Sequence, residues 1–206
     1  MAHDSSTPLM CALIPMSMIP CPALRRKLRL CFARRIMAHG RRPNRQAGER
    51  ASVHVVLFEP QIPPNTGNIA RTCAATGTVL HLVRPLGFQL DEASLRRAGL
   101  DYWHLVDVRL HDSLREVIAE AGTGGANCYF FTKFGVRRYS DVSYAPSDYL
   151  VFGKETTGLP DYVHREHAGC LLRFPMGTGV RSLNLSNTVA VAVYEALRQQ
   201  GFPDLT

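Results

Sequence analysis

Short apolar runs alternate along the chain, from Val53 onward, with longer stretches whose apolar residues recur at helical spacing. The short, β-branched runs predict buried strands, and the longer stretches predict amphipathic helices that end at glycines such as Gly77 and Gly201. The expected strands are 53–58, 79–83, 105–110, 127–132, 149–152 and 170–174, and the expected helices are 67–76, 91–98, 112–121, 160–167 and 185–200. This alternation is typical of an α/β fold with a mostly parallel sheet flanked by helices.

The first 50 residues differ from the rest of the chain in charge. They contain ten basic residues against Asp4 and Glu49, a net charge of +8, whereas the whole 206-residue chain carries +7. The remainder is therefore near neutral, at −1, and total charge does not by itself indicate that the folded part binds nucleic acid. We expect residues 1–50 to be a basic, disordered extension and residues 51–206 to fold as one domain.

Several function classes are disfavoured by what the sequence lacks. No apolar run approaches the roughly 20 residues that a transmembrane helix needs. The 6 cysteines form no CxxC pair and the 8 histidines form no HExxH, so we expect neither a metal site nor a disulfide framework. Such cysteine usage fits the reducing cytoplasm. No GxGxxG follows a predicted strand, which argues against a generic NAD-binding protein.

A polar loop, residues 59–71, follows the first predicted strand, at the sheet edge where ligands collect in parallel α/β folds. Asn65 or Thr66 is expected to cap the next helix. Asn68 and Arg71 are three residues apart and share a face near its start. An arginine there can bind a phosphate or a developing oxyanion, although an ordinary solvated surface arginine is the simpler alternative.

Two further loops, 152–160 and 175–182, also follow predicted strands. Gly153 permits close backbone approach to a ligand and Glu155 supplies a carboxylate, although a plain glycine turn is an alternative. The third loop leads into the hydroxyl- and amide-rich segment 181–187, at the start of a helix that is apolar on nearly every face. Such a start favours polar or anionic ligands, or is simply well capped. The backbone N–H and C=O groups of the third loop are suited to the edge of an adenine ring, and the faces of that ring would pack on Phe174, Met176 and Leu183.

The three loops occur in the order NxGNxxR at 65–71, FGxExxGLP at 152–160 and RSLNLSN at 181–187. This order resembles the SPOUT class of RNA 2′-O-ribose methyltransferases. Within that class, EPQIPPN at 59–65 and LRRAGLDY at 95–102 resemble the short members that act on the wobble position of tRNA. The resemblance covers about residues 53–203 and does not extend to residues 1–50.

The resemblance implies a C-terminal trefoil knot, in place of the unknotted fold that general rules predict. It also implies a homodimer that transfers a methyl group from S-adenosylmethionine to the ribose 2′-OH of cytidine or uridine 34, in the anticodon stem-loop of tRNA. The residues assigned to the cofactor are Phe131, Gly153, Phe174, Met176, Ser182, Leu183 and Asn187. Those assigned to catalysis are Arg71, Asn68, Glu155, Ser182 and Asn184.

Arg71 matches the catalytic arginine of the class. A guanidinium whose pKa exceeds about 12 is a poor base, so we assign Arg71 to clamping the oxyanion and phosphate. Glu155 is expected to orient loop or ribose hydroxyls, and Asn184 to cap or hold the catalytic loop. The candidate RNA contacts are Arg96, Arg97, Lys133, Arg137, Arg138 and Tyr194, with a solvated helix face as the alternative for Arg96 and Arg97.

Two rival functions remain open at this point. One is a SPOUT methyltransferase that acts on another tRNA position or on ribosomal RNA. The other is a noncatalytic RNA-binding dimer, which has no chemical need for Asn68, Arg71, Glu155, Ser182 and Asn184 together.

Overall fold

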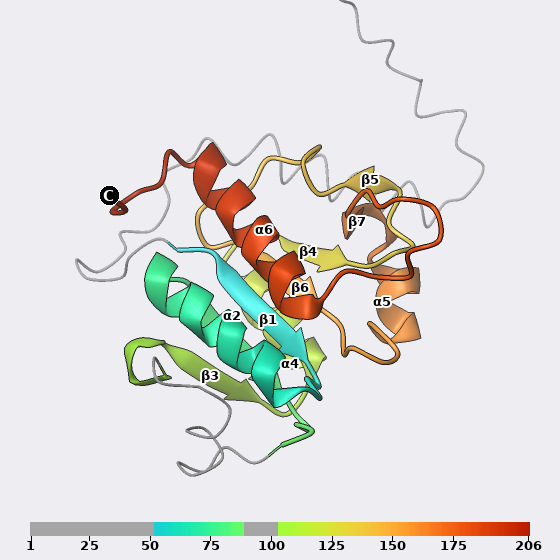
Figure 1. The fold of residues 1–206 in the computed structure, drawn as a ribbon, viewed down its shortest axis with the longest axis horizontal. Coiled ribbons are helices and arrows are strands. Elements are labelled where there is room, and N and C mark those ends of the chain that lie inside the picture. The colour runs from blue at the N-terminus through green and yellow to red at the C-terminus, as the bar shows by residue number, and fades with distance from the viewer. Residues whose placement is uncertain (1–51, 89–102) are drawn as a thin grey trace, which may run out of the picture. The chain divides into compact units, whose positions relative to one another are not determined.

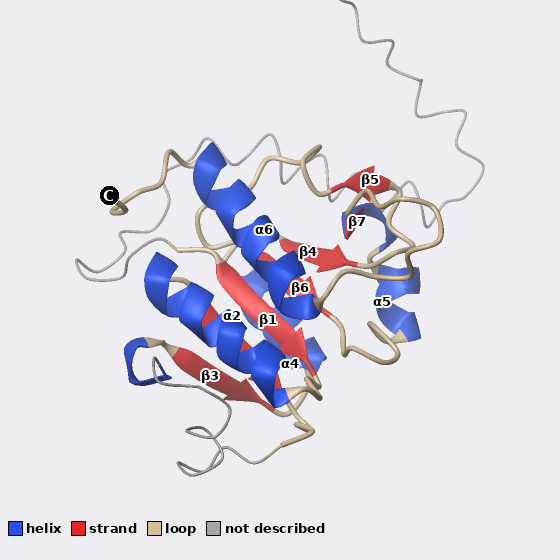
Figure 2. Ribbon diagram, in the orientation of Figure 1, coloured by secondary structure: helices blue, strands red, loops and turns tan. Residues whose placement is uncertain are grey.

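A computed structural model describes residues 52–88 and 103–206, in which seven strands form one sheet in the order β3-β2-β1-β6-β4-β7-β5. All strand pairs are parallel. The strands are β1 (His54–Phe58), β2 (Val79–Val83), β3 (Val108–His111), β4 (Cys128–Phe131), β5 (Arg137–Arg138), β6 (Tyr149–Phe152) and β7 (Leu171–Arg173) (Figures 1 and 2). The expected mostly parallel α/β sheet is confirmed.

Helices cover both faces of this sheet (Figure 1). The helices are α2 (Pro63–Thr76), α4 (Leu114–Thr123), α5 (Asp161–Glu166) and α6 (Leu185–Gln199), with short 3₁₀ turns η2 (Trp103–Leu105) and η3 (Ala168–Cys170). α2 and α6 pack on the face to which Val55 and Leu57 point, and α4 and α5 pack on the opposite face, beside Val56. No helix within the described ranges has the length and apolar character that crossing a membrane requires.

The central strands were predicted best because they are buried on both faces and read as continuous apolar runs. β2 and β6 lie where we expected them. The expected strand 105–110 is wrong at its start, because residues 103–105 form a 3₁₀ turn and pairing with β2 begins only at Val108. The two-residue strand β5 is too short and too polar to leave a pattern. The expected helix 91–98 lies outside the described residues.

The helix α2 begins four residues earlier than we expected, at Pro63. Prolines suit the first turn of a helix, where the backbone N–H has no intrahelical partner. The residue at the N-cap position is Ile62, so the expectation that Asn65 or Thr66 caps this helix is wrong. Both side chains are instead buried inside the first helical turn. The other end is as expected, with Gly77 in the left-handed conformation at φ 67°.

A buried carboxylate, Asp148, holds the amino ends of β1, β4 and β6 together. Its side chain is 1% exposed and accepts hydrogen bonds from the backbone N–H groups of Asn127 (2.9 Å) and Ala145 (2.7 Å). Its backbone carbonyl accepts a further bond from the N–H of His54 at 2.9 Å. One side chain therefore satisfies two backbone donors at the start of the sheet.

Replacing Asp148 with alanine is expected to lower the free energy of unfolding by about 2–4 kcal/mol, because two buried N–H groups lose their acceptor. Asp148→Asn keeps one acceptor oxygen and is expected to lose about half as much. Urea unfolding of the two variants beside the wild type measures both losses. Equal unfolding midpoints for wild type and Asp148→Ala would contradict this role.

Candidate active site

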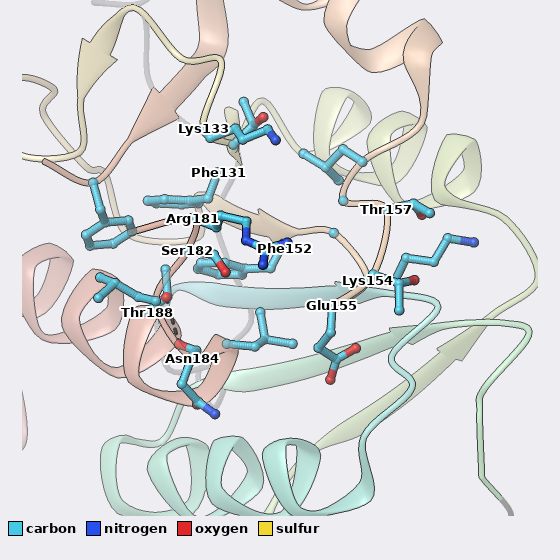
Figure 3. Close-up of a pocket in the computed structure, with 18 of the residues that line it drawn as sticks. Phe131, Lys133, Phe152, Lys154, Glu155, Thr157, Arg181, Ser182, Asn184 and Thr188 are labelled. Carbon is cyan, nitrogen blue, oxygen red and sulfur yellow. Dashed lines mark hydrogen bonds between the residues drawn. The ribbon is translucent and has the colours of Figure 1, made fainter. Parts of the chain in front are cut away.

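A cavity of about 730 Å³ opens where β4, β6 and β7 end. Phe131 and Phe152 are the last residues of β4 and β6, and Phe174 directly follows β7. All three line the cavity, together with the loops 153–159 and 181–185. Figure 3 shows these loops facing one another across the opening. The second and third predicted loops therefore meet at one site, at the sheet edge where parallel α/β folds bind ligands.

Aromatic rings form one wall of this cavity. The ring of Phe131 stacks on Phe152, with centroids 4.5 Å apart and an angle of 9° between the planes. Phe174 lies beside Phe131 at 5.6 Å and stacks on Tyr139 at 4.4 Å. Flat apolar surfaces of this kind suit the face of a heteroaromatic ring, while nearby loop backbone can read its polar edge.

Six of the seven residues predicted to contact a cofactor line the cavity, namely Phe131, Gly153, Phe174, Met176, Ser182 and Leu183. The seventh, Asn187, is not among its lining residues. It lies exposed in the first turn of α6, where its backbone N–H donates to Asn184 Oδ1 at 3.3 Å. Its backbone N–H thus serves the cap of α6, and the residue belongs to the helix start and not to the cavity wall.

The carboxylate of Glu155 binds the start of α2 across the cavity edge. Oε2 accepts from the backbone N–H of Gln61 at 3.0 Å, and Oε1 accepts from the N–H of Ile62 at 3.3 Å and from Asn65 Nδ2 at 3.1 Å. The first turn of α2 has no acidic residue of its own. Glu155 therefore supplies, from 93 positions beyond Ile62, the negative charge that a helix N-terminus favours.

Asn65 extends this contact to the start of α6. The side chain of Asn65 is 6% exposed, and its Oδ1 accepts from Asn184 Nδ2 at 3.0 Å. Asn184 is the N-cap of α6, and its Oδ1 accepts from Ser186 N–H at 2.9 Å as well as from Asn187. The expected capping role of Asn184 is confirmed. A continuous chain, Glu155–Asn65–Asn184, thus connects the N-termini of α2 and α6.

The glycine at position 153 is required by the loop itself. A Cβ at Gly153 would lie 2.2 Å from the carbonyl carbon of Gly158, a distance that no real contact reaches. The loop is closed further by the Lys154–Glu59 ion pair at 2.6 Å and by a bond of 2.7 Å from Thr156 Oγ1 to Gln61 Oε1. Close backbone approach was expected toward a ligand, and here it occurs between two parts of the same loop.

Arg71 and Asn68 are exposed on α2, and neither belongs to the residues that line the cavity. Asn65, one turn before Asn68, does line it. Because we placed the helix start at residue 67, we expected Asn65 to be a cap and Asn68 to share a face with Arg71 near the helix start. The earlier start at Pro63 puts Asn65 inside the first turn, where it is buried. The signal that could have found Asn65 is the double proline, which marks the first turn of α2.

A second cavity of about 360 Å³ adjoins the first and is lined by Lys133, Arg138, Arg173 and residues 174–180. Lys133 lines both cavities. Arg137, which precedes Arg138 on β5, is exposed, and its guanidinium donates to the backbone carbonyl of Asp141 at 3.1 Å. Tyr194 lies on α6, 49% exposed and outside both cavities. Arg96 and Arg97 lie outside the described residues.

Sequence reasoning missed several residues that line the two cavities: Asn65, Phe152, Lys154, Arg173 and Arg181. Arg181 opens the RSLNLSN motif, so its place in the motif was a usable signal. Arg173 ends a buried strand, and nothing in the local pattern distinguishes it from a solvated arginine. Its place beside Arg138 depends on the pairing of β5 with β7, which the sequence did not predict.

None of the described cysteines, Cys73, Cys128 and Cys170, forms a disulfide. Burial raises the pKa of Cys73 and of Cys128 to about 12, so both thiols are protonated at neutral pH. Besides its aromatic and aliphatic groups, the first cavity is lined by amides, hydroxyls, cations, the carboxylate of Glu155 and the imidazole of His164.

The family model for the SpoU rRNA Methylase family matches residues 52–194, which include nearly all of the described fold and both cavities. The chain belongs to this family. It is similar to a Geobacillus stearothermophilus protein that carries tRNA (cytidine(34)-2'-O)-methyltransferase in its name, with 54% identity over 158 residues, 75% of this chain and 99% of the relative.

The chain is also similar in fold to two solved structures. A structure described as giving insights into the 2-OH methylation of C/U34 on tRNA is 47% identical, with a TM-score of 0.68, and covers 73% of this chain and 97% of its own. An AdoMet-bound rRNA methyltransferase from Sinorhizobium meliloti is 25% identical, with a TM-score of 0.65, over 73% of this chain and 57% of its own. The wobble-enzyme resemblance in the sequence is thus confirmed at the family level.

Asn184→Ala is expected to lower the free energy of unfolding by about 2 kcal/mol, because it removes the cap of α6 and leaves Asn65 Oδ1 without its donor. Asn184→Ser can still cap the helix but cannot reach Asn65, so it is expected to lose about half as much. Chemical unfolding of both variants tests this order. A serine variant as stable as the wild type would show that the bridge to Asn65 contributes nothing, and one as unstable as the alanine variant would show that the cap contributes nothing beyond that bridge.

Proposed function

We propose that this protein transfers the methyl group of S-adenosylmethionine to the ribose 2′-OH of nucleotide 34, cytidine or uridine, in tRNA. The observation that carries the proposal is the cavity of about 730 Å³, built by the loops 153–159 and 181–185, in a SpoU-family chain whose relatives bear this activity in their names. A tRNA substrate would place the activity in the cytoplasm.

The residues around the cavity fit S-adenosylmethionine. The stacked rings of Phe131, Phe152 and Phe174 offer an apolar wall for the adenine, and the cavity volume lies within the ordinary range for small-molecule sites, roughly 300–1,000 Å³. The bound cofactor would supply a sulfonium methyl that a ribose oxygen can attack. Ser182 and Leu183 also line the cavity and would hold the cofactor in place.

Arg71 would act on the attacking oxygen rather than on the cofactor. Its planar guanidinium can bind a phosphate and the developing oxyanion together, which a single ammonium cannot do in the same geometry. The proton of the 2′-OH would pass to a phosphate of the nucleotide or to solvent. Glu155 would act indirectly, by fixing the loop 153–159 against the start of α2.

The active protein would be a homodimer in which Arg71 reaches the cavity of the partner subunit. Arg71 is exposed on α2 and does not line the cavity of its own chain. The neighbouring helix α6 exposes Val191 (44%) and Tyr194 (49%), apolar side chains three residues apart on one face. A second copy seated on α2 and α6 would cover these side chains.

The tRNA would bind over the second cavity, where Lys133, Arg138 and Arg173 converge next to the methyl-donor site. Three cations at the mouth of the catalytic cavity would hold the phosphates of the anticodon stem-loop. Affinity that depends on such contacts falls as salt rises, because condensed counterions are released on binding. Arg96 and Arg97 remain candidates for the same surface.

We also propose that the C-terminal segment forms a trefoil knot. In support, β7 lies near one edge of the sheet, whereas the helix that follows it, α6, returns to pack against α2 over the other half. The intervening loop, 175–184, contributes to both cavities on the way.

Ribosomal RNA is the second candidate substrate, because the S. meliloti neighbour is an rRNA methyltransferase. The higher identity of the wobble-position relatives, 54% and 47%, favours tRNA. A noncatalytic RNA-binding dimer would also bind tRNA, but it would transfer no methyl group in a single-turnover assay.

The direct test is nucleoside analysis of tRNA after incubation with pure protein and S-adenosylmethionine. We expect 2′-O-methylcytidine or 2′-O-methyluridine at position 34. Arg71→Lys is expected to retain cofactor affinity and to lose at least about 100-fold in transfer rate, because lysine replaces the guanidinium fork with a point charge.

Calorimetric titration with the cofactor is the control for the lysine variant, since binding and transfer are then measured separately. Methylation at another nucleotide, or only of ribosomal RNA, would overturn the choice of substrate. Normal turnover by Arg71→Lys would overturn the clamp role of Arg71.

Mixing two inactive variants tests the dimer. Arg71→Ala keeps its cavity intact, and Gly153→Ala breaks its cavity but keeps Arg71. If Arg71 acts across the interface, mixed dimers contain one complete site, and random exchange is expected to restore about a quarter of wild-type activity. The measurement is methyl transfer before and after subunit exchange, with Gly122→Ala, whose Cβ would meet no atom within 4 Å, as a neutral control. A mixture no more active than its components would place Arg71 in its own subunit's site.

A further inference from the structure

Three histidines on adjacent strands form a continuous chain across the sheet, away from both cavities. His54 Nδ1 lies 2.8 Å from His81 Nε2, and His81 Nδ1 lies 2.8 Å from His111 Nε2. The side chains come from β1, β2 and β3, and the central one, His81, is fully buried. They lie on the face that α4 covers, because His81 is two residues from Val83 on β2 and therefore points to the same face, where Val83 packs against that helix.

The central imidazole, His81, is fully buried and has a partner at each ring nitrogen. A neutral imidazole has one N–H donor and one lone pair, so the chain has a direction. When His111 Nε2 donates to His81 Nδ1, His81 Nε2 donates to His54 Nδ1, and each contact is satisfied.

A carboxylate from α4 completes the group. One oxygen of Glu120, His81 Nδ1 or Nε2 and one nitrogen of His111 lie within 4.8 Å of one another. Glu120 is oriented by the hydroxyl of Tyr149, which donates to its Oε1 at 3.1 Å. Tyr149 in turn stacks on His54, with centroids 4.3 Å apart and planes inclined by 5°. Two of the three prospective ligands are therefore held by a neighbour outside the group, His81 by His54 and Glu120 by Tyr149.

We propose that His81 Nδ1, His111 Nε2 and the Glu120 carboxylate bind a divalent transition-metal ion such as Zn²⁺. Two imidazoles and one carboxylate are a ligand set that zinc accepts, with water in the fourth position. The nitrogens of His81 and His111 need to separate from 2.8 Å to about 3.3 Å, the spacing of two ligands on a tetrahedral zinc.

Binding needs no net loss of protons. The proton on His111 Nε2 moves, through solvent, to Nδ1 of the same ring, and both facing lone pairs then point to the ion. The N–H of His81 Nε2 keeps its bond to His54 Nδ1. A second nitrogen that donates to a fixed acceptor is the usual support of a metal-binding histidine. His54 is thus a positioning residue of the site.

The charges near the group allow a cation. Arg109 lies 3.6 Å from Glu120, but its stronger contact is with Asp107 at 2.9 Å. The ion would replace Arg109 as the counter-charge of Glu120, while Arg109 remains paired with Asp107. Glu120 is exposed and His111 half-buried, so an ion can enter from solvent. The bound metal would fasten α4 to the β2–β3 edge of the sheet.

The experiment is titration of the chelator-treated full chain with Zn²⁺ by calorimetry, and with Co²⁺ by visible absorption, which reports nitrogen and oxygen ligands. We expect saturation at one ion per chain and a rise in melting temperature on binding. His111→Gln and Glu120→Gln are each expected to weaken binding by at least about 10-fold. His104→Gln, an exposed histidine on η2, is the matched control and should bind as the wild type does.

Glutamine at position 111 can still hydrogen-bond to His81 at a half-buried site, so this variant is expected to fold, and circular dichroism checks that it does. Binding that is absent from the wild type, or that is unchanged in both variants, would overturn the proposal and leave the histidines as a hydrogen-bonded chain only. Cofactor affinity provides an independent readout, because none of these residues lines either cavity. It should be the same with and without Zn²⁺.

Discussion

The hydrogen-bonded chain Glu155–Asn65–Asn184 is the constraint on which the candidate active site depends. Each N-terminus of an α-helix presents backbone N–H groups that need acceptors. In this fold the acceptor for the N-terminus of α2 is Glu155, in the loop after β6. The acceptor for the N-terminus of α6 is Asn184, whose side chain also donates a hydrogen bond to Asn65. Two helix starts and one loop therefore share a single polar connection, and a shift in any of them changes the cavity that all three border.

The cavity and the proposed catalytic arginine belong to different surfaces of the chain. The aromatic wall, the loop 153–159 and the start of α6 surround the cavity, whereas Arg71 is exposed on α2 and does not line it. The same α2 is joined to the cavity by Asn65, so the position of Arg71 is coupled to the loop that would hold the cofactor. In the proposed dimer, a shift of α2 in one subunit would therefore move Arg71 relative to the cavity of the other subunit.

Polar groups are also concentrated on the opposite half of the molecule, around His81. A buried histidine on a central strand is costly unless both ring nitrogens find partners, and here two other histidines provide them. The sheet therefore carries two polar groups: one lies at its carboxyl edge, where chemistry would occur, and the other lies on the face beneath α4. The two are separate in space and in the residues that build them.

The sequence by itself determined the parallel α/β sheet, because strands buried on both faces leave long apolar runs such as 79–83 and 149–152. It also determined the loops that form the cavity, because their glycines and polar residues follow strands directly. Only the tertiary structure decided that Asn65 rather than Asn68 faces the cavity, that Arg173 lies beside Lys133, and that three histidines meet. These depend on strand order and helix start, which are set by contacts between residues far apart in the chain and leave no local pattern.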